Sequence, residues 1–388
     1  MSRWLIPVLM FVSIGGSLTL AEPPLDGRDG RPLALENFRP KSQLILPRTD
    51  IQRAKFPVVD VHVHPKLRFR HAPDELDAFV RIMDEQNIAV CVSLDGGLGD
   101  DLQEHQDYLW TKYRERFVIF ANLDWQGAGR DDEPATWAVN QPGFGRQMAQ
   151  ALELAHGEGA SGLKIFKEFG LVYKNANGSL IKIDDPRFDP IWESCGRLGM
   201  PVLIHTADPV AFFEPIDETN ERWEELRRHP DWSFHGETFP AHGELLASLL
   251  RVVKRHPETT FIAAHLINYA ENLSAVGAWL DEHPNLYVDT TSRINELGRQ
   301  PYTAREFFVK YSDRILFGSD GPRPAPRLLP QWRFFETRDE YFPYAENPFP
   351  PQGLWNIHGI GLPDDVLRKL YHENAARIIP GVRERLGE

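Results

Sequence analysis

FPVVDVHVHP, residues 56–65, is an apolar run that ends in two histidines placed two residues apart. The run 56–64 is predicted to be a buried β-strand, because β-branched residues dominate it. Residues two apart on a strand point to the same side, so His62 and His64 would share one face. Two neutral imidazoles at a fixed separation suit a metal ion. An isolated His-x-His pair is also frequent by chance, so the metal interpretation needs further ligands elsewhere in the chain.

Seven further apolar runs follow the first, and segments with helical spacing and charged faces alternate with all of them. The predicted strands are 56–64, 88–94, 116–124, 160–166, 199–206, 259–266, 285–291 and 314–320. The predicted helices are 74–87, 105–116, 145–159, 187–199, 242–257, 270–284, 302–314 and 363–379. Strands that alternate with helices pair in parallel, and continuous apolar runs indicate burial on both faces of the sheet.

Eight strand–helix units are the number found in a closed (β/α)8 TIM barrel, the α/β fold that we expect here. We expect it in a distorted form, with long loops at the C-terminal mouth. An open doubly wound sheet is the alternative. No glycine-rich phosphate-binding turn follows the first strand to support that alternative.

Composition limits the partners of the chain. The sequence has 388 residues, 42% of them hydrophobic, and a formal net charge of −13. Nucleic acids and anionic membranes require a basic surface, so neither is expected as the main partner. We expect a small-molecule substrate, with a homodimer as the usual oligomeric state.

The N-terminus has the pattern of an export signal. Arg3 precedes an apolar run that ends near Ile14, and small residues around Ala21 precede a proline-rich segment. This pattern predicts a signal peptide over 1–21 and a periplasmic or secreted protein. Residues 22–55 are predicted to form an N-terminal arm, and 56–388 the barrel. The two cysteines, Cys91 and Cys195, fall in a predicted strand and a predicted helix, so we expect buried thiols.

Polar residues of the ligand type fall late in several of the predicted strands. They are His62 and His64 in the first strand, Lys164 in the fourth, His205 in the fifth, His265 in the sixth and Asp320 in the eighth. The C-terminal ends of the strands of such a barrel carry its chemistry. Burying several such groups without partners would cost several kcal/mol each, so we expect them to meet at a metal site.

Five motifs resemble the metal-dependent amidohydrolase superfamily, within it the amidohydrolase-related branch that includes aminocarboxymuconate-semialdehyde decarboxylase. The motifs are DVHVHP, PVLIHT, FIAAHL, ILFGSD and the closing ENAARIIPG. The resemblance covers the chain from Phe56 onward. It implies that His62, His64, His205 and Asp320 bind the metal and that His265 lies beside the water on it.

Three imidazoles and one carboxylate suit one divalent metal, zinc first, with manganese, iron or cobalt as alternatives. Zinc lowers the pKa of its water towards about 7. Asp320 would then accept a proton from that water, while His265 would orient the water or stabilise the oxyanion. Two-metal members of the superfamily carry a carboxylated lysine on the fourth strand. Lys164 could instead pair with Asp320, hold a substrate carboxylate or extend to solvent.

These residues predict a hydrolase that acts on an amide, ester or lactone through a metal-activated water. The alternative is a metal-dependent carboxy-lyase, or decarboxylase, of a small unsaturated or aromatic acid. A ligand-binding barrel without catalysis is the alternative of another class, which the intact ligand set disfavours.

Long aromatic loops follow the fifth and eighth strands, at 207–240 and 321–355. They are candidates for a lid, with core extension or a subunit interface as alternatives. By position alone, Asp208, Arg293, Arg323 and His235 could line the pocket, although loop salt bridges would explain them equally. Asn177-Gly178, within 171–183, predicts a hairpin turn.

Overall fold

The structure is a computed structural model of the chain, and it describes residues 25–38, 40–345 and 352–387. The chain divides into two compact units, Met1–Leu46 and Pro47–Glu388. The predicted signal peptide, 1–21, lies outside the described residues. The described part of the first unit holds two 3₁₀ turns, η1 (Arg28–Gly30) and η2 (Leu35–Asn37). Residues 47–55, which the sequence assigns to the arm, group with the second unit.

The second unit is built on eight parallel strands, each paired with the next in chain order. The strands are β1 (Val58–Val63), β2 (Ile88–Ser93), β3 (Phe117–Asn122), β4 (Gly162–Ile165), β5 (Val202–Ile204), β6 (Phe261–Ala263), β7 (Leu286–Asp289) and β8 (Ile315–Leu316). Every predicted strand is therefore present, although each is shorter than its apolar run.

The last strand returns to the first and closes the sheet. The Val61 amide donates to the Phe317 carbonyl at 3.0 Å, and the His64 amide donates to the Gly321 carbonyl at 2.7 Å. These bonds exclude the open doubly wound alternative. The second unit is a (β/α)8 TIM barrel, as the eight repeated units predict.

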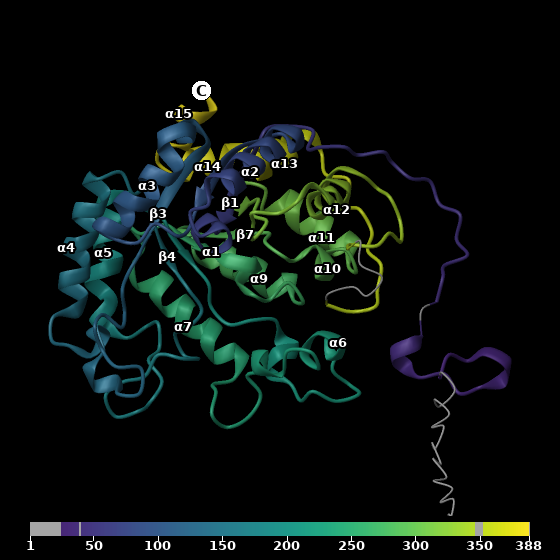
Figure 1. Ribbon diagram of the computed structural model, residues 1–388, viewed down its shortest axis with the longest axis horizontal. Helices are drawn as coiled ribbons and strands as arrows, with labels where there is room; N and C mark the ends of the chain where they lie inside the picture. Colours follow the sequence, from purple (N-terminus) through teal and green to yellow (C-terminus); the bar gives the residue numbers. More distant parts are fainter. Residues whose placement is uncertain (1–24, 39, 346–351, 388) are drawn as a thin grey trace, which may run out of the picture. The chain divides into compact units, whose positions relative to one another are not determined.

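The main helices lie outside the ring of strands (Figure 1). They are α2 (Pro73–Gln86), α3 (Asp100–Tyr113), α4 (Phe144–Gly157), α5 (Asp189–Leu198), α7 (His242–Arg255), α9 (Leu273–Glu282) and α11 (Pro301–Lys310). The predicted last helix, 363–379, is interrupted. It consists of α13 (Asp364–Arg368), a π-helical segment (Lys369–Glu373) and α14 (Asn374–Ile378), before α15 (Val382–Leu386).

Two apolar clusters follow from the alternation of side chains along the strands. One fills the interior of the barrel with residues such as Val90, Val118 and Leu316. The other lies between strands and helices and includes Trp192, as well as the buried thiol of Cys91. The strands are thus buried on both faces, which explains why they read as continuous apolar runs.

The first strand departs from this alternation just before its histidines. Val61 packs in the interior cluster, whereas Val63 packs in the outer one. Across the same stretch, Asp60 pairs with Cys91 and Val63 pairs with Ser93, so β1 carries one residue more than β2. Such a bulge redirects side chains. It turns both histidines into the mouth of the barrel, an orientation that strict alternation from Val61 would not give.

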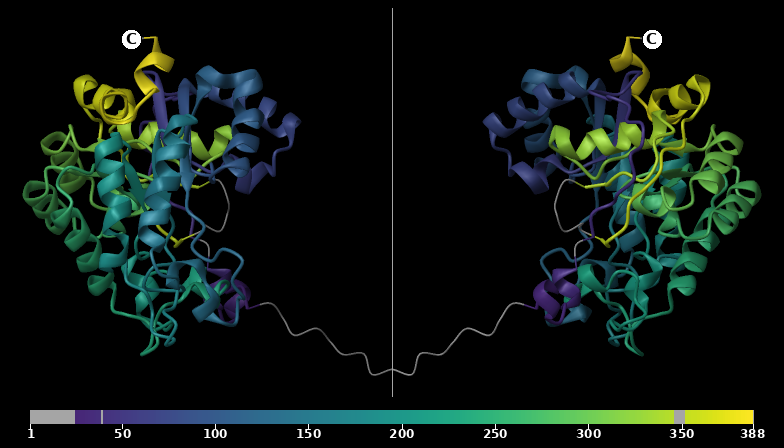
Figure 2. Two further views of the ribbon diagram at one scale, coloured as in Figure 1. Left: turned by 90° about the vertical axis from the view of Figure 1, so that its left-hand side faces the viewer. Right: turned by 90° about the vertical axis from the view of Figure 1, so that its right-hand side faces the viewer.

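The long segments after β5 and β8 are folded. The first contains η7 (Val210–Phe213), α6 (Trp223–Leu226) and η8 (Pro230–Trp232). The second contains α12 (Ala325–Glu336), whose Trp332 and Phe335 are buried in the outer cluster. The segment around α6 lies at the end of the barrel opposite α15 and the C-terminus (Figures 1 and 2). The described residues include no helix with the length and apolarity needed to span a bilayer.

The predicted hairpin around Asn177 is present as a short turn. Lys174 and Leu180 form a single antiparallel bridge, and the Asn177 carboxamide oxygen accepts the amide of Ser179 at 3.0 Å. Gly178 has φ of 84°, which a residue with a Cβ rarely adopts.

Candidate active site

The two histidines at the end of β1 are held by carboxylates at the ends of other strands. His62 Nδ1 lies 2.9 Å from Asp289 Oδ2 at the end of β7, and His64 Nδ1 lies 2.7 Å from Asp95 Oδ1 after β2. A neutral imidazole that donates from Nδ1 keeps the lone pair on Nε2. Both rings are buried, with 1% and 5% of the residue exposed. Burial, followed by the charge of Lys164, holds the pKa of His62 well below its ordinary value, which favours this neutral form.

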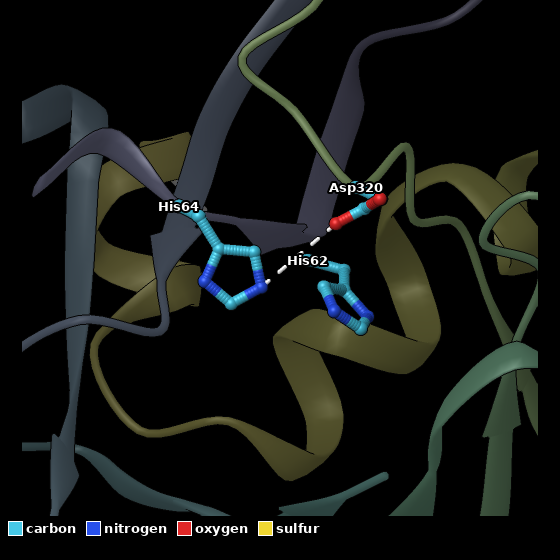
Figure 3. A group of neighbouring side chains, drawn as sticks. All are labelled: His62, His64 and Asp320. Atoms are coloured by element: carbon cyan, nitrogen blue, oxygen red, sulfur yellow. Dashed lines mark ion pairs between the residues drawn. The ribbon is translucent and has the colours of Figure 1, made fainter. Parts of the chain in front are cut away.

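Asp320 completes a group with these two rings. Its Oδ1 lies 3.9 Å from His64 Nε2, while its Oδ2 accepts a hydrogen bond from Arg323 Nη2 at 3.0 Å. Figure 3 shows the three side chains converging on one space. Ligand atoms of His62, His64 and Asp320 all lie within 4.8 Å of one another.

Positive φ angles are frequent where the strands open onto the pocket. Asp320 has φ of 56°, and Ala207 and Ser292 have similar values after β5 and β7. After β6, the residues from His265 to Asn268 all have φ between 50° and 59°. Backbone strain of this kind is typical of functional sites that hold side chains in fixed directions.

His205, the predicted third imidazole ligand, lines the same cavity but lies outside the three-residue group. Its Nε2 is buried without a hydrogen-bond partner among the described residues, and the nearest carboxylate oxygen, Asp208 Oδ1, is 3.7 Å away. Burial lowers the pKa of His205, and the negative charge of Asp208 opposes this shift. A buried lone pair without a partner is costly, and an ion would satisfy it.

His265 packs against two of the predicted metal ligands, His205 and His62. Its ring centroid is 4.4 Å from that of His205 and 5.1 Å from that of His62. Its Nδ1 bonds the carbonyl of Thr291 at 2.9 Å, and its amide donates to Asp289 Oδ1 at 2.8 Å. Its Nε2 is therefore the free ring nitrogen. Burial first, then the charge of His205, keeps the pKa of His265 well below its ordinary value.

Lys164 is fully inside the barrel, with 1% of the residue exposed, so its side chain does not extend to solvent. Its Nζ lies 3.5 Å from His62 Nε2 and 5.2 Å from the centre of the Phe166 ring. Burial lowers the pKa of Lys164 to about 8, although Asp289 and Asp320 oppose the shift. The lysine thus belongs to the site.

Asp60, the acidic residue of DVHVHP, joins β1 to the end of β8. Its carboxylate accepts hydrogen bonds from Ser319 Oγ at 2.5 Å, the Ser319 amide at 3.0 Å and the His62 amide at 3.1 Å. Burial raises the pKa of Asp60 to about 7. Its role is to fix the backbone that carries His62 and Asp320.

Three functional carboxylates were not predicted from the sequence, namely Asp60, Asp95 and Asp289. Each stands in or directly after an apolar strand, in VVDVH, VSLDGG and YVDTT. A carboxylate in an apolar strand needs a partner. Its position in the sequence could therefore have marked each of these residues as a candidate for the site. The identity of the partner depends on which side chains face each other across the mouth.

The predicted site residues His62, His64, Lys164, His205, His265 and Asp320 line a cavity of about 660 Å³. The sequence suggested four loop residues for the wall of this pocket. Three of them, Asp208, Arg293 and Arg323, line the cavity, and each of the three also forms an ion pair. His235 is exposed, bonds the Phe213 carbonyl and is not among the lining residues. Residues of both long segments, including Phe212 and Tyr344, contribute to the wall.

The donor set fits a divalent ion. Bonds of about 2.0 to 2.2 Å span ligands up to about 4.4 Å apart, so a small inward movement of His62, His64 and Asp320 would enclose an ion. The two rings already have the tautomer that presents Nε2, and carboxylates fix their orientation as in known metal sites. The orphaned Nε2 of His205 is a further donor in the same cavity.

Comparison with known proteins gives one family. No curated protein matches the chain. The solved structures that match include 2,6-dihydroxybenzoate decarboxylase from Rhizobium, with 16% identity, a TM-score of 0.48 and coverage of 83% of this chain and 98% of that one. They also include 4-oxalomesaconate hydratase from Rhodopseudomonas palustris, with 14% identity, a TM-score of 0.48 and coverage of 85% and 98%. Likenesses this low say nothing about the reaction.

The family model described as Amidohydrolase matches residues 59–381, most of the chain and all of the barrel strands after Val58. The match includes every histidine and carboxylate of the site. The family is metal-dependent and its members are enzymes. The chain belongs to the amidohydrolase family.

Proposed function

We propose that this enzyme hydrolyses an amide, ester or lactone bond of a small molecule, using a water activated by one divalent metal ion. The observation that carries the proposal is the group formed by His62, His64 and Asp320, in which a carboxylate engages Nδ1 of each ring and ligand atoms of all three residues lie within 4.8 Å of one another. His205 is proposed as the further ligand, because its buried Nε2 has no hydrogen-bond partner among the described residues.

The metal, when bound, would lower the pKa of a water molecule and polarise the substrate carbonyl. Asp320 Oδ1 would accept the proton of that water and pass it to the leaving group. Arg323 holds the other oxygen of Asp320 at 3.0 Å and so fixes the direction of the carboxylate. His265 donates from Nδ1 to the Thr291 carbonyl, so its Nε2 would carry the lone pair and would orient the water by accepting a hydrogen bond from it.

Decarboxylation is the second candidate, and the charge of the cavity favours it. The wall carries more basic than acidic side chains, which suits a substrate that is itself a carboxylate. In this reaction Asp320 would deliver to the carbon atom the proton that replaces the departing carboxyl group. The products separate the candidates, because hydrolysis gives an acid with an amine or alcohol, whereas decarboxylation gives carbon dioxide.

Zinc is the metal that we propose first, since three imidazoles and one carboxylate suit it, with manganese, iron and cobalt to be tested beside it. The substrate is proposed to be a small molecule, and neither nucleic acid nor a membrane is expected to bind. Export after cleavage near Ala21 and assembly as a homodimer remain proposals.

The first experiment is elemental mass spectrometry on the purified protein and on the double variant His62→Ala, His64→Ala. About one transition metal per chain, lost in the variant, supports the single-metal site. About two metals would place Lys164 in a bridging role. No metal under any reconstitution would overturn the proposal.

The second experiment follows products from carboxylate-bearing lactones, amides and aromatic acids. Asp320→Asn is expected to remove turnover while the far-ultraviolet circular dichroism stays that of the wild type. Asp313→Asn, at an exposed carboxylate, is the matched control and is expected to stay active. A fully active Asp320→Asn enzyme would contradict the proton-transfer role.

A further inference from the structure

The cavity is positively charged within an acidic protein. Its basic lining residues are Arg68, Lys164, Lys167, Arg222, Arg293, Arg323 and Arg327. Its acidic lining residues are Asp208, Glu225 and Asp320. The net charge of the chain is −13, so this concentration of basic side chains is local. A cavity lined by one sign of charge attracts ligands of the opposite sign.

Several of these basic side chains already have a carboxylate at hydrogen-bond distance. Lys167 Nζ donates to Asp208 Oδ2 at 2.5 Å. Arg222 Nη1 donates to Glu225 Oε2 at 2.8 Å. Their charges are largely neutralised, so these groups are poor candidates for holding a substrate.

Arg293 differs from them. It is 5% exposed and lines the cavity, yet its Nε and Nη1 have no hydrogen-bond partner among the described residues. The nearest carboxylate oxygen, Glu296 Oε1, is 3.6 Å from Nη1. That oxygen already accepts hydrogen bonds from Arg222 Nη2 and from Asn295 Nδ2. A buried guanidinium with unmet donors is costly and calls for a partner.

A second carboxylate, Glu271, also lies near Arg293. Glu271 is close enough to interact electrostatically, and both of its oxygens are buried without a hydrogen-bond partner among the described residues. Burial first, then the charge of Glu296, raises the pKa of Glu271, so its ability to neutralise Arg293 is reduced. Glu296 is shared with Arg222. Neither carboxylate therefore satisfies the donors of Arg293.

The position of Arg293 relative to the catalytic residues follows from the backbone. It lies in the loop that follows β7, and its amide donates to the Thr290 carbonyl at 3.2 Å. Thr291, two residues earlier, provides the carbonyl that orients His265. The guanidinium is also close enough for its charge to act on His265. A ligand held by Arg293 would thus lie beside the proposed reaction centre.

We propose that Arg293 is a specificity-determining residue that binds a carboxylate of the substrate, separate from the group that reacts. A planar guanidinium can hold a carboxylate through two parallel N–H donors, which a lysine cannot imitate. The substrate class is then a small organic acid. For hydrolysis it carries a carboxylate beside its amide, ester or lactone, and for decarboxylation it carries a second carboxylate. This inference rests on the proposed function.

The test measures binding of isophthalate, glutarate and benzoate to the metal-loaded protein by isothermal titration calorimetry, with isophthalamide as the neutral analogue. Wild-type protein is expected to bind at least one carboxylate and to bind the diamide far more weakly. Arg293→Gln is expected to weaken that binding about 10- to 100-fold, and Arg293→Lys to recover only part of the loss.

Arg327→Gln is the matched control, because Arg327 is an exposed arginine that lines the same cavity. It is expected to change binding much less than Arg293→Gln does. Equal losses in the two variants would mean that only the general field of the cavity acts, and would overturn the proposal. So would unchanged binding in Arg293→Gln, or the absence of carboxylate binding by the wild type.

Metal content and thermal unfolding are measured on every variant. If Arg293→Gln fails to fold, binding is measured instead on two other variants. These are the double variant Arg293→Gln, Glu296→Gln and the charge-preserving Arg293→Lys. A wild-type protein without metal would overturn the proposed function but not the carboxylate site, which the same titration would still report. Loss of carboxylate binding with full metal content identifies Arg293 itself.

Discussion

At the scale of single residues, the site depends on carboxylates that hold its imidazoles in place. Asp95 accepts from His64 Nδ1 and also from the Leu67 amide at 3.2 Å, so it fixes both the ring and the chain after it. Asp289 does the same for His62, and in addition accepts the amides of His265 and Thr291. Such partners fix the tautomer and raise the basicity of a ligand.

We therefore expect Asp95→Asn to weaken metal binding by about 10- to 100-fold. The amide oxygen can still accept from His64, but the negative charge that favours the ligand is gone. Competition with a fluorescent chelator measures the affinity. Asp107→Asn, at an exposed position on α3, is the control. Unchanged affinity in Asp95→Asn would show that the hydrogen bond alone matters.

His105 gives a second prediction away from the metal site. It is fully buried, its Nε2 lies 2.7 Å from Ser93 Oγ, and its Nδ1 lies 3.0 Å from His71 Nε2. Burial, opposed by the charge of Asp95, lowers the pKa of His105 to about 4. The unfolded chain, with an ordinary pKa near about 6.5, binds more protons between these values. Stability should therefore fall as the pH falls from about 6.5 to about 4.

The contribution of His105 over this range is at most about 3 kcal/mol of unfolding free energy. It is measured by urea unfolding at pH 7 and near pH 4, in the wild type and in His105→Gln. The variant should lose less stability on acidification, and the exposed His156→Gln should behave as the wild type. An equal acid effect in all three proteins would contradict the assignment.

The candidate site could be predicted only in part at this scale. His62, His64, His265 and Asp320 stand where apolar strands end, and a polar group placed there is visible in the sequence. The unmet donors of Arg293 were not visible, because they result from the sharing of Glu296 with Arg222 and Asn295. Such sharing depends on side-chain positions in three dimensions, which spacing along the chain does not contain.

At the scale of elements, the bulge in β1 shows what a periodic pattern omits. Alternation predicts that His62 and His64 share a face, and they do, but strict alternation from the inward-facing Val61 would turn that face away from the barrel interior. The extra residue between Asp60 and Val63 turns it inward instead. A run of six buried residues has no polar face from which that residue could be recognised.

Helix α4 provides a prediction with an internal control. A Cβ on Gly145 would lie 1.9 Å from the backbone oxygen of Arg187, whereas a Cβ on Gly157, in the same helix, would meet nothing within 4 Å. Gly145→Ala should therefore cost about 1 to 3 kcal/mol, because the backbone before α5 must move. Gly157→Ala should stabilise by up to about 1 kcal/mol through helix propensity.

Chemical unfolding measures both variants against the wild type. The opposite signs are the result that matters, since a general effect of alanine in α4 would move both proteins in the same direction. A neutral Gly145→Ala protein would mean that the segment carrying Arg187 can shift away from α4 without loss of packing.

At the scale of the whole molecule, eight repeated units were enough to predict the barrel, because each strand buries both faces and pairs with its sequence neighbours. The structure of the long segments after β5 and β8 was harder to predict from the sequence. Their aromatic residues indicate burial but not partners, and α12 begins after prolines that a sequence pattern assigns equally well to a loop. The predicted arm, 22–55, has no such repeating pattern that would fix where it ends.

The proposed metal site lies at the closure of the barrel, and this position leads to the last prediction. His62 lies in β1, His64 directly follows it and Asp320 follows β8, and these are the two strands that complete the ring. An ion bound between them would connect the first and last strands of the unit. Ion binding to the native state alone stabilises by about 2.7 kcal/mol when the ion is at 100 times its dissociation constant. A chelator should therefore lower the midpoint of thermal unfolding, and adding back the metal should restore it.

The variant His62→Ala, His64→Ala should unfold at the same temperature with and without chelator. If chelation lowered both midpoints equally, the stabilising ion would have to bind elsewhere, and the closure of this barrel would not depend on it.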